Sequence, residues 1–333
     1  MVGDKNIMKI KEFVEDFLVD EISNIKPKKE GEYTYFQLKK NNYTTQRAIH
    51  QVSRNLRIAR SRIGFAGNKD KFAITTQVCS AWKIEPEELD HINLKDLKIK
   101  ALGKGDERIN LGDLEGNKFK IIIRDVSEQE LANFKKNFTI IKKKGFLNLF
   151  GEQRFGSAGN SDKIGNAIIN GNLEEAAKLF ITEHGNNVVA QEFGDFAKKN
   201  WGQWVDIINK CPKFLGLEKA VLNWLIRVPT DFGGALRQVP KPTRRIFISA
   251  YQSRIWNKKV EELAKQNKLE AELKIPPIDI KRMPELTMLG TERQTCIIPK
   301  KLKQKTKKDL VELEFELSKG CYATVLIDTL FNS

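Results

Sequence analysis

The pattern of apolar residues in this chain changes type twice, and this change constrains the fold more than any other feature. Up to about residue 157 and again beyond about residue 290, most segments alternate apolar and polar residues as strands do. Between them, apolar residues recur every three or four positions, and glycine or proline ends each stretch, as in short helices. We therefore predict an α+β fold in which one sheet-bearing domain, residues 1–157 and 291–333, is interrupted by an inserted, mainly helical domain, residues 158–290.

The individual elements follow from the same periodicities. Strands are predicted over 17–22, 33–39, 72–82 and 309–317, where β-branched and aromatic residues alternate with polar ones. Helices are predicted over 44–60 behind a threonine cap, from the capping box "SEQE" at 127–130, and over 243–265 and 322–331. The last of these should dock through Ala323, Leu326, Ile327 and Leu330. The pair Gly116 and Asn117 predicts a hairpin turn.

Charge indicates the kind of partner. The chain carries 58 Lys and Arg against 43 Asp and Glu, a formal net charge of +15, which favours a polyanion. Nucleic acid is favoured over an anionic membrane, because no apolar run approaches the ~18 residues needed to span a bilayer. The first ten residues also lack the apolar core of a signal peptide. We expect a cytoplasmic protein with no membrane partner; a charge that serves solubility alone is the alternative.

Several kinds of chemistry have no support in the sequence. The four cysteines lie far apart without a C-x-x-C pair, and the three histidines are scattered, so no zinc-ligand spacing exists. None of these histidines lies near a nucleophile elbow of the G-x-S-x-G type, which argues against a hydrolase triad. No phosphate-binding loop or dinucleotide fingerprint is present. We therefore expect neither a metal nor a cofactor, nucleotide cofactors included.

The stretch "GFAGNKDKF" (64–72) places one carboxylate, Asp70, between Lys69 and Lys71 just before a predicted strand. One interpretation is a solvated turn, since Gly, Asn and Asp are common turn residues. The other is a nucleophile, because the flanking lysines favour the charged form of the aspartate and an ionised carboxylate can attack an electrophilic carbon. Composition alone favours the turn.

The stretch "GFLNLFGEQRFGS" (145–157) is the second unusual segment. Glycines frame Phe150, Arg154 and Phe155, with Asn148 and Gln153 as amide donors and acceptors. Flat rings, a guanidinium and amides are the groups that recognise unstacked RNA bases. The alternative is a tight turn whose phenylalanines fill the core.

Six blocks, in order, carry a resemblance to a known family. They are "EDFLVDEI" (15–22), "LKKNNYTTQRAI" (38–49), "GFAGNKDKFAITTQ" (64–77), "LNLFGEQRFGS" (147–157), "SAYQSRIWN" (249–257) and "KGCYATVLIDTLF" (319–331). With them the chain resembles the tRNA pseudouridine synthase D (TruD) family, in its archaeal or eukaryote-like branch. The resemblance covers nearly the whole chain. One departure is Leu149, where many members have tyrosine.

The resemblance implies a fold and an activity. The fold is a pseudouridine synthase catalytic domain with a mixed, largely antiparallel sheet, interrupted by a mainly helical α+β TRUD domain. The activity is isomerisation of a uridine in tRNA, in the family at position 13, to pseudouridine, with the target base flipped out and without a cofactor. The expected partner is tRNA or another structured RNA, and the expected state is a monomer. A non-catalytic RNA-binding or RNA-chaperone protein that retains the fold is the alternative.

The resemblance also implies roles for individual residues. Asp70 matches the catalytic aspartate of the family, and Phe150 resembles the ring that stacks on the flipped uracil, with Asn148 as a positioning group. Lys69, Lys71 and Glu21 fall in matching blocks, where they would hold the aspartate, a substrate phosphate or the strand ends.

Overall fold

The computed structural model describes residues 8–332. It divides into two compact units: a sheet unit, which runs to Phe146 and resumes at Ile297, and a helical unit, Leu147–Cys296. The sequence pattern placed these boundaries at 157/158 and 290/291, so the segment 147–157 lies in the helical unit instead. It belongs there because Leu147, Leu149 and Phe150 pack against a helical-unit core around Trp256.

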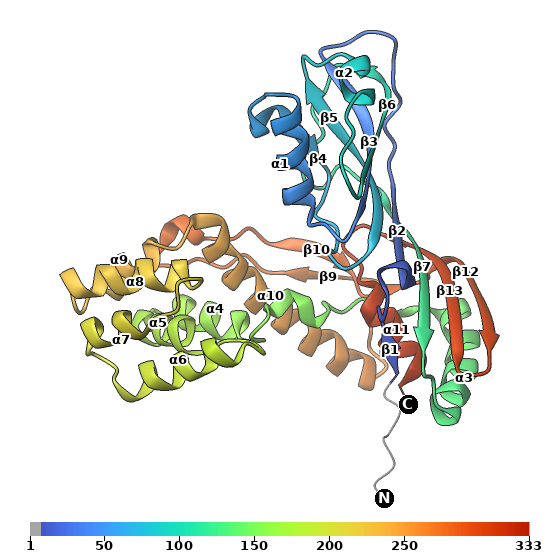
Figure 1. Ribbon diagram of the computed structural model, residues 1–333. Coiled ribbons are helices and arrows are strands. Elements are labelled where there is room, and N and C mark those ends of the chain that lie inside the picture. Colours follow the sequence, from blue (N-terminus) through green and yellow to red (C-terminus); the bar gives the residue numbers. More distant parts are fainter. Residues whose placement is uncertain (1–7, 333) are drawn as a thin grey trace, which may run out of the picture. The chain divides into compact units, whose positions relative to one another are not determined.

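The sheet unit is built on one mixed, largely antiparallel sheet, which confirms the predicted fold class (Figure 1). Its main strand order is β12-β13-β7-β2-β5-β3-β6, while β1 pairs with β7 and β4 with β5. Within residues 8–332, β2 and β5 are the only neighbouring strands of this sheet that run parallel. The strands are β1 (Lys9–Ile10), β2 (Phe17–Ile22), β3 (Tyr33–Asn41), β4 (Ile63–Phe65), β5 (Ile74–Trp82), β6 (Leu97–Gly105), β7 (Gly116–Arg124), β12 (Lys300–Lys307) and β13 (Leu310–Ser318).

Helices cover one face of this sheet at both of its ends. Helix α1 (Thr45–Asn55) packs through Ile49 and Val52 on Phe36, Leu38 and other residues of β3 and β5. Farther along, α3 (Glu128–Lys144) and α11 (Ala323–Phe331) lie side by side next to β7 and β13 (Figure 1). The four apolar residues predicted to dock α11 are all buried. A short helix, α2 (Pro86–Asp90), lies against β6.

Two local expectations were wrong. Gly116 and Asn117 do not form a turn but begin β7, where Gly116 pairs with both Ile22 and Ser318. A side chain at Gly116 would collide with the carbonyl of Leu317, so the glycine serves close strand packing rather than reversal. The helix expected over 44–60 ends at Asn55, because Arg57 takes a left-handed backbone with φ 54°.

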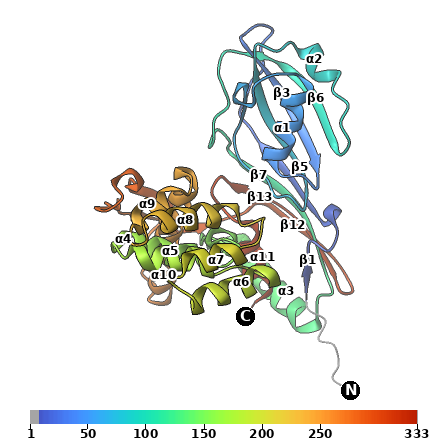
Figure 2. The same cartoon turned by 60° about the vertical axis from the view of Figure 1, so that its left-hand side comes forward.

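The helical unit surrounds two apolar clusters and carries a small antiparallel pair, β9 (Glu272–Ile275) with β10 (Thr291–Gln294). The helices of this unit are α4 (Ser161–Ile169), α5 (Leu173–Thr182), α6 (Val188–Lys199), α7 (Trp204–Lys210), α8 (Gly216–Arg227), α9 (Phe232–Arg237) and α10 (Lys241–Lys265). Figure 2 brings α6, α7 and α8 forward. The chain passes between the units at β8 (Phe146–Leu147) and β11 (Cys296–Ile297).

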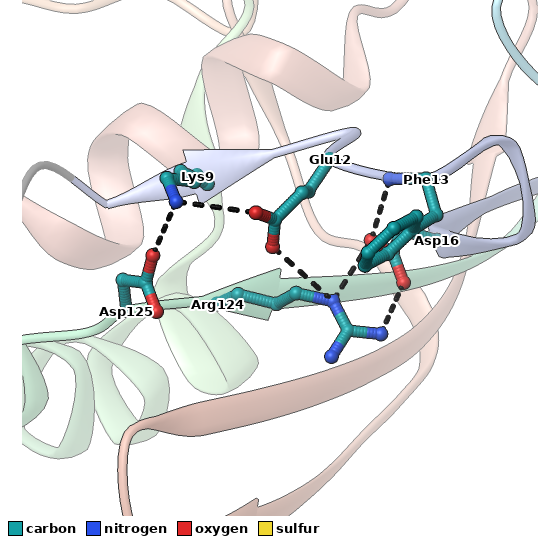
Figure 3. A network of polar contacts seen from close by, with 6 residues as sticks. All are labelled: Lys9, Glu12, Phe13, Asp16, Arg124 and Asp125. Carbon is teal, nitrogen blue, oxygen red and sulfur yellow. Dashed lines mark hydrogen bonds and ion pairs between the residues drawn. The ribbon is translucent and has the colours of Figure 1, made fainter.

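An ion-pair network fastens the segment 9–16 to β7 (Figure 3). The Arg124 guanidinium donates to both carboxylate oxygens of buried Asp16, at 2.9 and 2.8 Å, and the Phe13 amide donates to the same group at 3.0 Å. Lys9 lies 2.8 Å from Asp125 and 3.1 Å from Glu12. Burial raises the pKa of Asp16, but the hydrogen bonds from Arg124 and Phe13 outweigh burial and leave that pKa below its usual value.

We expect Asp16→Asn to lower the free energy of unfolding by about 2 kcal/mol at pH 7, since it removes charge-assisted hydrogen bonds from a buried group. The lowered pKa of Asp16 adds stability above its unfolded value of 3.8, and this is lost as pH falls through the folded pKa. Urea unfolding at several pH values should therefore show the two proteins converging in acid. Glu12→Gln, at the exposed rim of the network, is the control, with an effect below about 0.5 kcal/mol. A difference in unfolding free energy between the parent and Asp16→Asn that does not change with pH would contradict this expectation.

Candidate active site

Asp70 lies in the loop between β4 and β5, with its side chain 35% exposed. Its Oδ2 atom is 2.7 Å from the Nζ atom of Lys11, which is only 18% exposed and also lies 4.0 Å from the centroid of the Phe17 ring. The backbone of Lys11 is left-handed, with φ 63°, in the segment fastened by Arg124. The partly exposed Asp70 carboxylate is thus paired with a cation from the segment before β2, 59 residues earlier in the chain.

The Asp70 loop covers a break in the apolar face of the sheet. Four adjacent strands bear polar residues at positions where the strand periodicity places core residues, between the cluster under α1 and the phenylalanines of β2, β7 and β13. We call these residues the polar belt: Asn117 on β7, Glu21 on β2, Thr75 and Gln77 on β5, and Lys40 on β3. Buried polar groups cost stability unless they are paired, so this belt points to function.

Lys69 ties the loop to the belt. Its Nζ atom lies 2.7 Å from Glu21 Oε2 and donates to Asn117 Oδ1 at 2.7 Å. This pair is buried, with the Lys69 and Glu21 side chains 6% and 1% exposed, and Glu21 also accepts from the Val78 amide at 3.1 Å. Lys71 is exposed, and its side chain makes no hydrogen bond or ion pair with residues 8–332.

The backbone of the loop is also held. Gln77 donates to the Gly67 carbonyl at 3.2 Å, and the Lys69 amide donates to the hydroxyl of Thr45, which itself contacts Gln77. Lys40 Nζ donates to the Asp70 carbonyl at 2.5 Å. Burial, together with the nearby charge of Lys69, lowers the pKa of Lys40 to about 8, although the charge of Asp70 opposes this shift. The loop therefore presents Asp70 from a fixed main chain.

Sequence reasoning missed Lys11 and Lys40. A signal for Lys40 exists, because it follows Phe36 and Leu38 on the alternating buried face of β3, where lysine is out of place. No comparable signal exists for Lys11, which reaches Asp70 only through the fold. Gln77, which the pattern allowed as an ordinary sheet residue, belongs to the polar belt.

Asn148 and Phe150 lie in the helical unit, where they organise one loop. The Asn148 amide is 4% exposed; its Nδ2 donates to the Gln294 carbonyl at 2.9 Å, and its Oδ1 accepts from Arg293 at 2.6 Å. Asn257, on α10, accepts from the Phe150 amide at 2.8 Å and donates to the Phe150 carbonyl at 2.9 Å. Both main-chain polar groups of Phe150 are therefore fixed by a single side chain.

The Phe150 ring is half-buried and lies near two guanidiniums. The Arg293 Cζ atom is 4.1 Å and the Arg154 Cζ atom 5.5 Å from the ring centroid. Arg154 donates to the hydroxyl of Ser253 at 3.1 Å. Phe155, the other phenylalanine of this loop, is fully buried, so the core-filling interpretation holds for Phe155. Cations beside an aromatic ring suit a surface that meets a base and its phosphate.

Within residues 8–332, no three His, Cys, Asp or Glu side chains gather as metal ligands would. No helix in the same span combines the length and the apolar character needed to cross a membrane.

Comparisons with known proteins place the chain in a family. The family model for tRNA pseudouridine synthase D (TruD) matches residues 4–274 and 265–329, and the chain belongs to this family. A Methanosarcina acetivorans protein named probable tRNA pseudouridine synthase D is 38% identical over 259 residues, 75% of this chain but 58% of that protein. The chain thus spans less than two thirds of that relative.

Two further comparisons extend over almost the whole chain. A Methanococcus maripaludis protein, named probable tRNA pseudouridine synthase D 1, is 29% identical over 98% of this chain and 100% of its own length. A TruD crystal structure from Methanosarcina mazei superposes with a TM-score of 0.79 at 26% identity, covering 100% of this chain and 95% of that one. The α+β fold is therefore that of the family.

We expect Lys69→Met to lower the free energy of unfolding by about 3 kcal/mol, because it leaves the Glu21 carboxylate buried without its cation. Adding Glu21→Gln should restore part of this loss, since the double variant buries no charge. Lys71→Met is the matched control, with an effect within about 0.5 kcal/mol, because Lys71 is exposed. Urea unfolding measures all four proteins. Equal losses for Lys69→Met and Lys71→Met would contradict the buried ion pair.

Proposed function

We propose that this protein isomerises a uridine of tRNA to pseudouridine, with Asp70 as the essential catalytic group. Membership of the TruD family supports this reaction, and so do the names of the relatives. The observation that carries it is the Asp70 carboxylate itself: partly exposed, 2.7 Å from Lys11, and set on a main chain fixed by Lys40, Thr45 and Gln77.

The chemistry explains why such a carboxylate is needed. The C1′–N1 bond breaks, the uracil turns, and a C1′–C5 bond forms; C5 then loses a proton and N1 gains one, so no electron or group enters from outside. The carboxylate could add to the base, attack the sugar carbon, or remove a proton from the ribose. Each route requires an ionised oxygen aimed at the nucleotide. Lys11 and the buried cations around the loop stabilise negative charge there.

Lys71 and Phe150 receive roles that fit their exposure. Lys71 is exposed beside Asp70 and is suited to a phosphate of the target nucleotide. Phe150 stacks on the flipped uracil, while Asn148 and Asn257 fix the loop that carries it. Flipping a base costs a few kcal/mol, and stacking contributes ~1 to 3 kcal/mol per base, so one ring can offset much of this cost.

The remaining assignments complete the proposal. The sheet unit is the catalytic domain, and the helical unit is the inserted TRUD domain. The target is the family's expected uridine, at position 13 of tRNA, and the enzyme acts in the cytoplasm as a monomer. A non-catalytic RNA-binding protein is the competing function.

We expect Asp70→Asn to abolish tritium release from tRNA labelled at uracil C5, because the amide cannot act as an anion, and to leave tRNA affinity within about threefold. The measurement is release under single-turnover conditions beside the parent protein. Asp20→Asn, on the opposite face of β2, is the matched control and should react like the parent. Equal release from the parent and Asp70→Asn would remove Asp70 from the mechanism, and release from neither would favour the RNA-binding function.

We expect Phe150→Leu to lower kcat/KM at least tenfold and Phe150→Tyr to retain most of it, because only the latter keeps a ring for stacking at ~1 to 3 kcal/mol. The Leu variant keeps the apolar volume that packs near Trp256, so folding should persist. Turnover by Phe150→Leu at the parental rate would rule out stacking on the uracil as the role of Phe150.

A further inference from the structure

The outer edge of the sheet unit has a hollow that the catalytic assignment does not use. It has a volume of about 490 Å³ and lies where α3 meets the edge strand β12. The residues that line it are Phe138 and Lys142 of α3, Leu302, Lys303, Gln304 and Lys305 of β12, and Glu312 and Glu314 of β13. This volume falls in the range of pockets that hold small organic groups, about 300 to 1,000 Å³.

The lining combines the groups that contact RNA. Lys142, Lys303 and Lys305 form no ion pair with a residue in the span 8–332, whereas the two carboxylates already face a cation, with Lys120 Nζ 3.0 Å from Glu312 and 3.9 Å from Glu314. Gln304 adds an amide, and half-buried Phe138 adds an aromatic ring. Further exposed lysines continue the row at both ends: Lys143, Lys300, Lys307 and Lys308. Unpaired cations and an aromatic ring that line one hollow suit a phosphate with its base.

The sheet places this hollow within reach of an RNA that occupies the catalytic centre. In the strand order, β13 and β7 separate β12 from β2, which carries Glu21 beneath the Asp70 loop. Three strand spacings amount to about 14 Å, more than one nucleotide but well within a tRNA. Successive residues of β12 point to opposite sides of the sheet, so Lys303 and Lys305 share a side with Glu314 and Glu312, and Gln304 lies on the other. Through β13 and β7, Gln304 shares its side with Glu21 and the Asp70 loop, so an RNA bound at Asp70 must pass around the β12 edge to meet Lys303 and Lys305.

We propose that this hollow is an auxiliary RNA-binding site, which holds the phosphate backbone of the bound tRNA away from the reacting uridine. The inference rests on the proposed function only in taking tRNA as the ligand. Lysines on an edge strand have a second explanation, since they prevent strands of two molecules from pairing. Charge reversal separates the two explanations: glutamate still protects an edge but repels phosphate.

The test compares tRNA affinity by fluorescence anisotropy, with an unmodified tRNA transcript as the probe at several KCl concentrations. The variant is Lys142→Glu/Lys303→Glu/Lys305→Glu. Its matched control is Lys95→Glu/Lys98→Glu/Lys100→Glu, three exposed lysines in and beside β6, the opposite edge strand, with the same change in net charge. The corresponding triple glutamine variant at the hollow guards against misfolding, and thermal unfolding monitors all of them.

We expect the hollow variant to bind tRNA at least tenfold more weakly at about 0.1 M salt and to lose about two units from the slope of log affinity against log salt. The triple glutamine variant should show a smaller loss of the same kind, and the control should stay within about threefold. Equal losses at the two edges, or parental affinity for both hollow variants, would overturn the proposal. The binding measurement does not depend on turnover. If the parent protein were inactive but substitution at the hollow still weakened tRNA binding, the proposed isomerase activity would be contradicted and the proposed RNA-binding site would stand.

Discussion

The contact on which the functional account depends is the 2.7 Å ion pair between Lys11 and Asp70. Lys11 comes from the segment before β2, and Asp70 from the loop before β5, so neither reaches the other unless the sheet has formed. Arg124 and Asp16 hold the Lys11 segment on β7. Folding of the sheet thus brings Lys11 and Asp70 together, and Lys11 then stabilises negative charge at the Asp70 loop.

The polar belt lowers the stability of the sheet unit unless its buried groups are paired. Glu21, Gln77 and Lys40 are charged or polar groups placed where the sheet otherwise buries apolar side chains, and each buried group left unpaired costs stability. Most of its members have partners: Lys69 of the loop faces Glu21 and Asn117, Gln77 holds Gly67, and Lys40 holds the Asp70 carbonyl. The buried hydroxyl of Thr75 has no hydrogen-bond partner within residues 8–332. The Asp70 carboxylate remains partly open, as a group that meets a substrate must.

The sequence predicted the architecture well because the elements have clear periods. The alternation of β13 and the apolar stripe of α11 gave both elements correctly, and the mixed sheet followed from the family blocks. Two features escaped because tertiary packing decided them. The segment 147–157 was assigned to the sheet domain, but Leu147, Leu149 and Phe150 pack with Trp256 in the helical unit, and Gly116 was expected in a turn but allows β7 to approach β13 closely. Asp70 and Lys69 were found through their block, whereas Lys11 required the folded chain.

The most direct measurement of the central claim is the single-turnover rate of pseudouridine formation in tRNA by Lys11→Ala, with Lys11→Arg beside it. Removing a preorganised charge next to a catalytic group typically costs about a hundredfold in rate. The account predicts such a loss for Lys11→Ala, a smaller loss for Lys11→Arg, and tRNA affinity close to that of the parent for both. Parental turnover by Lys11→Ala would contradict it.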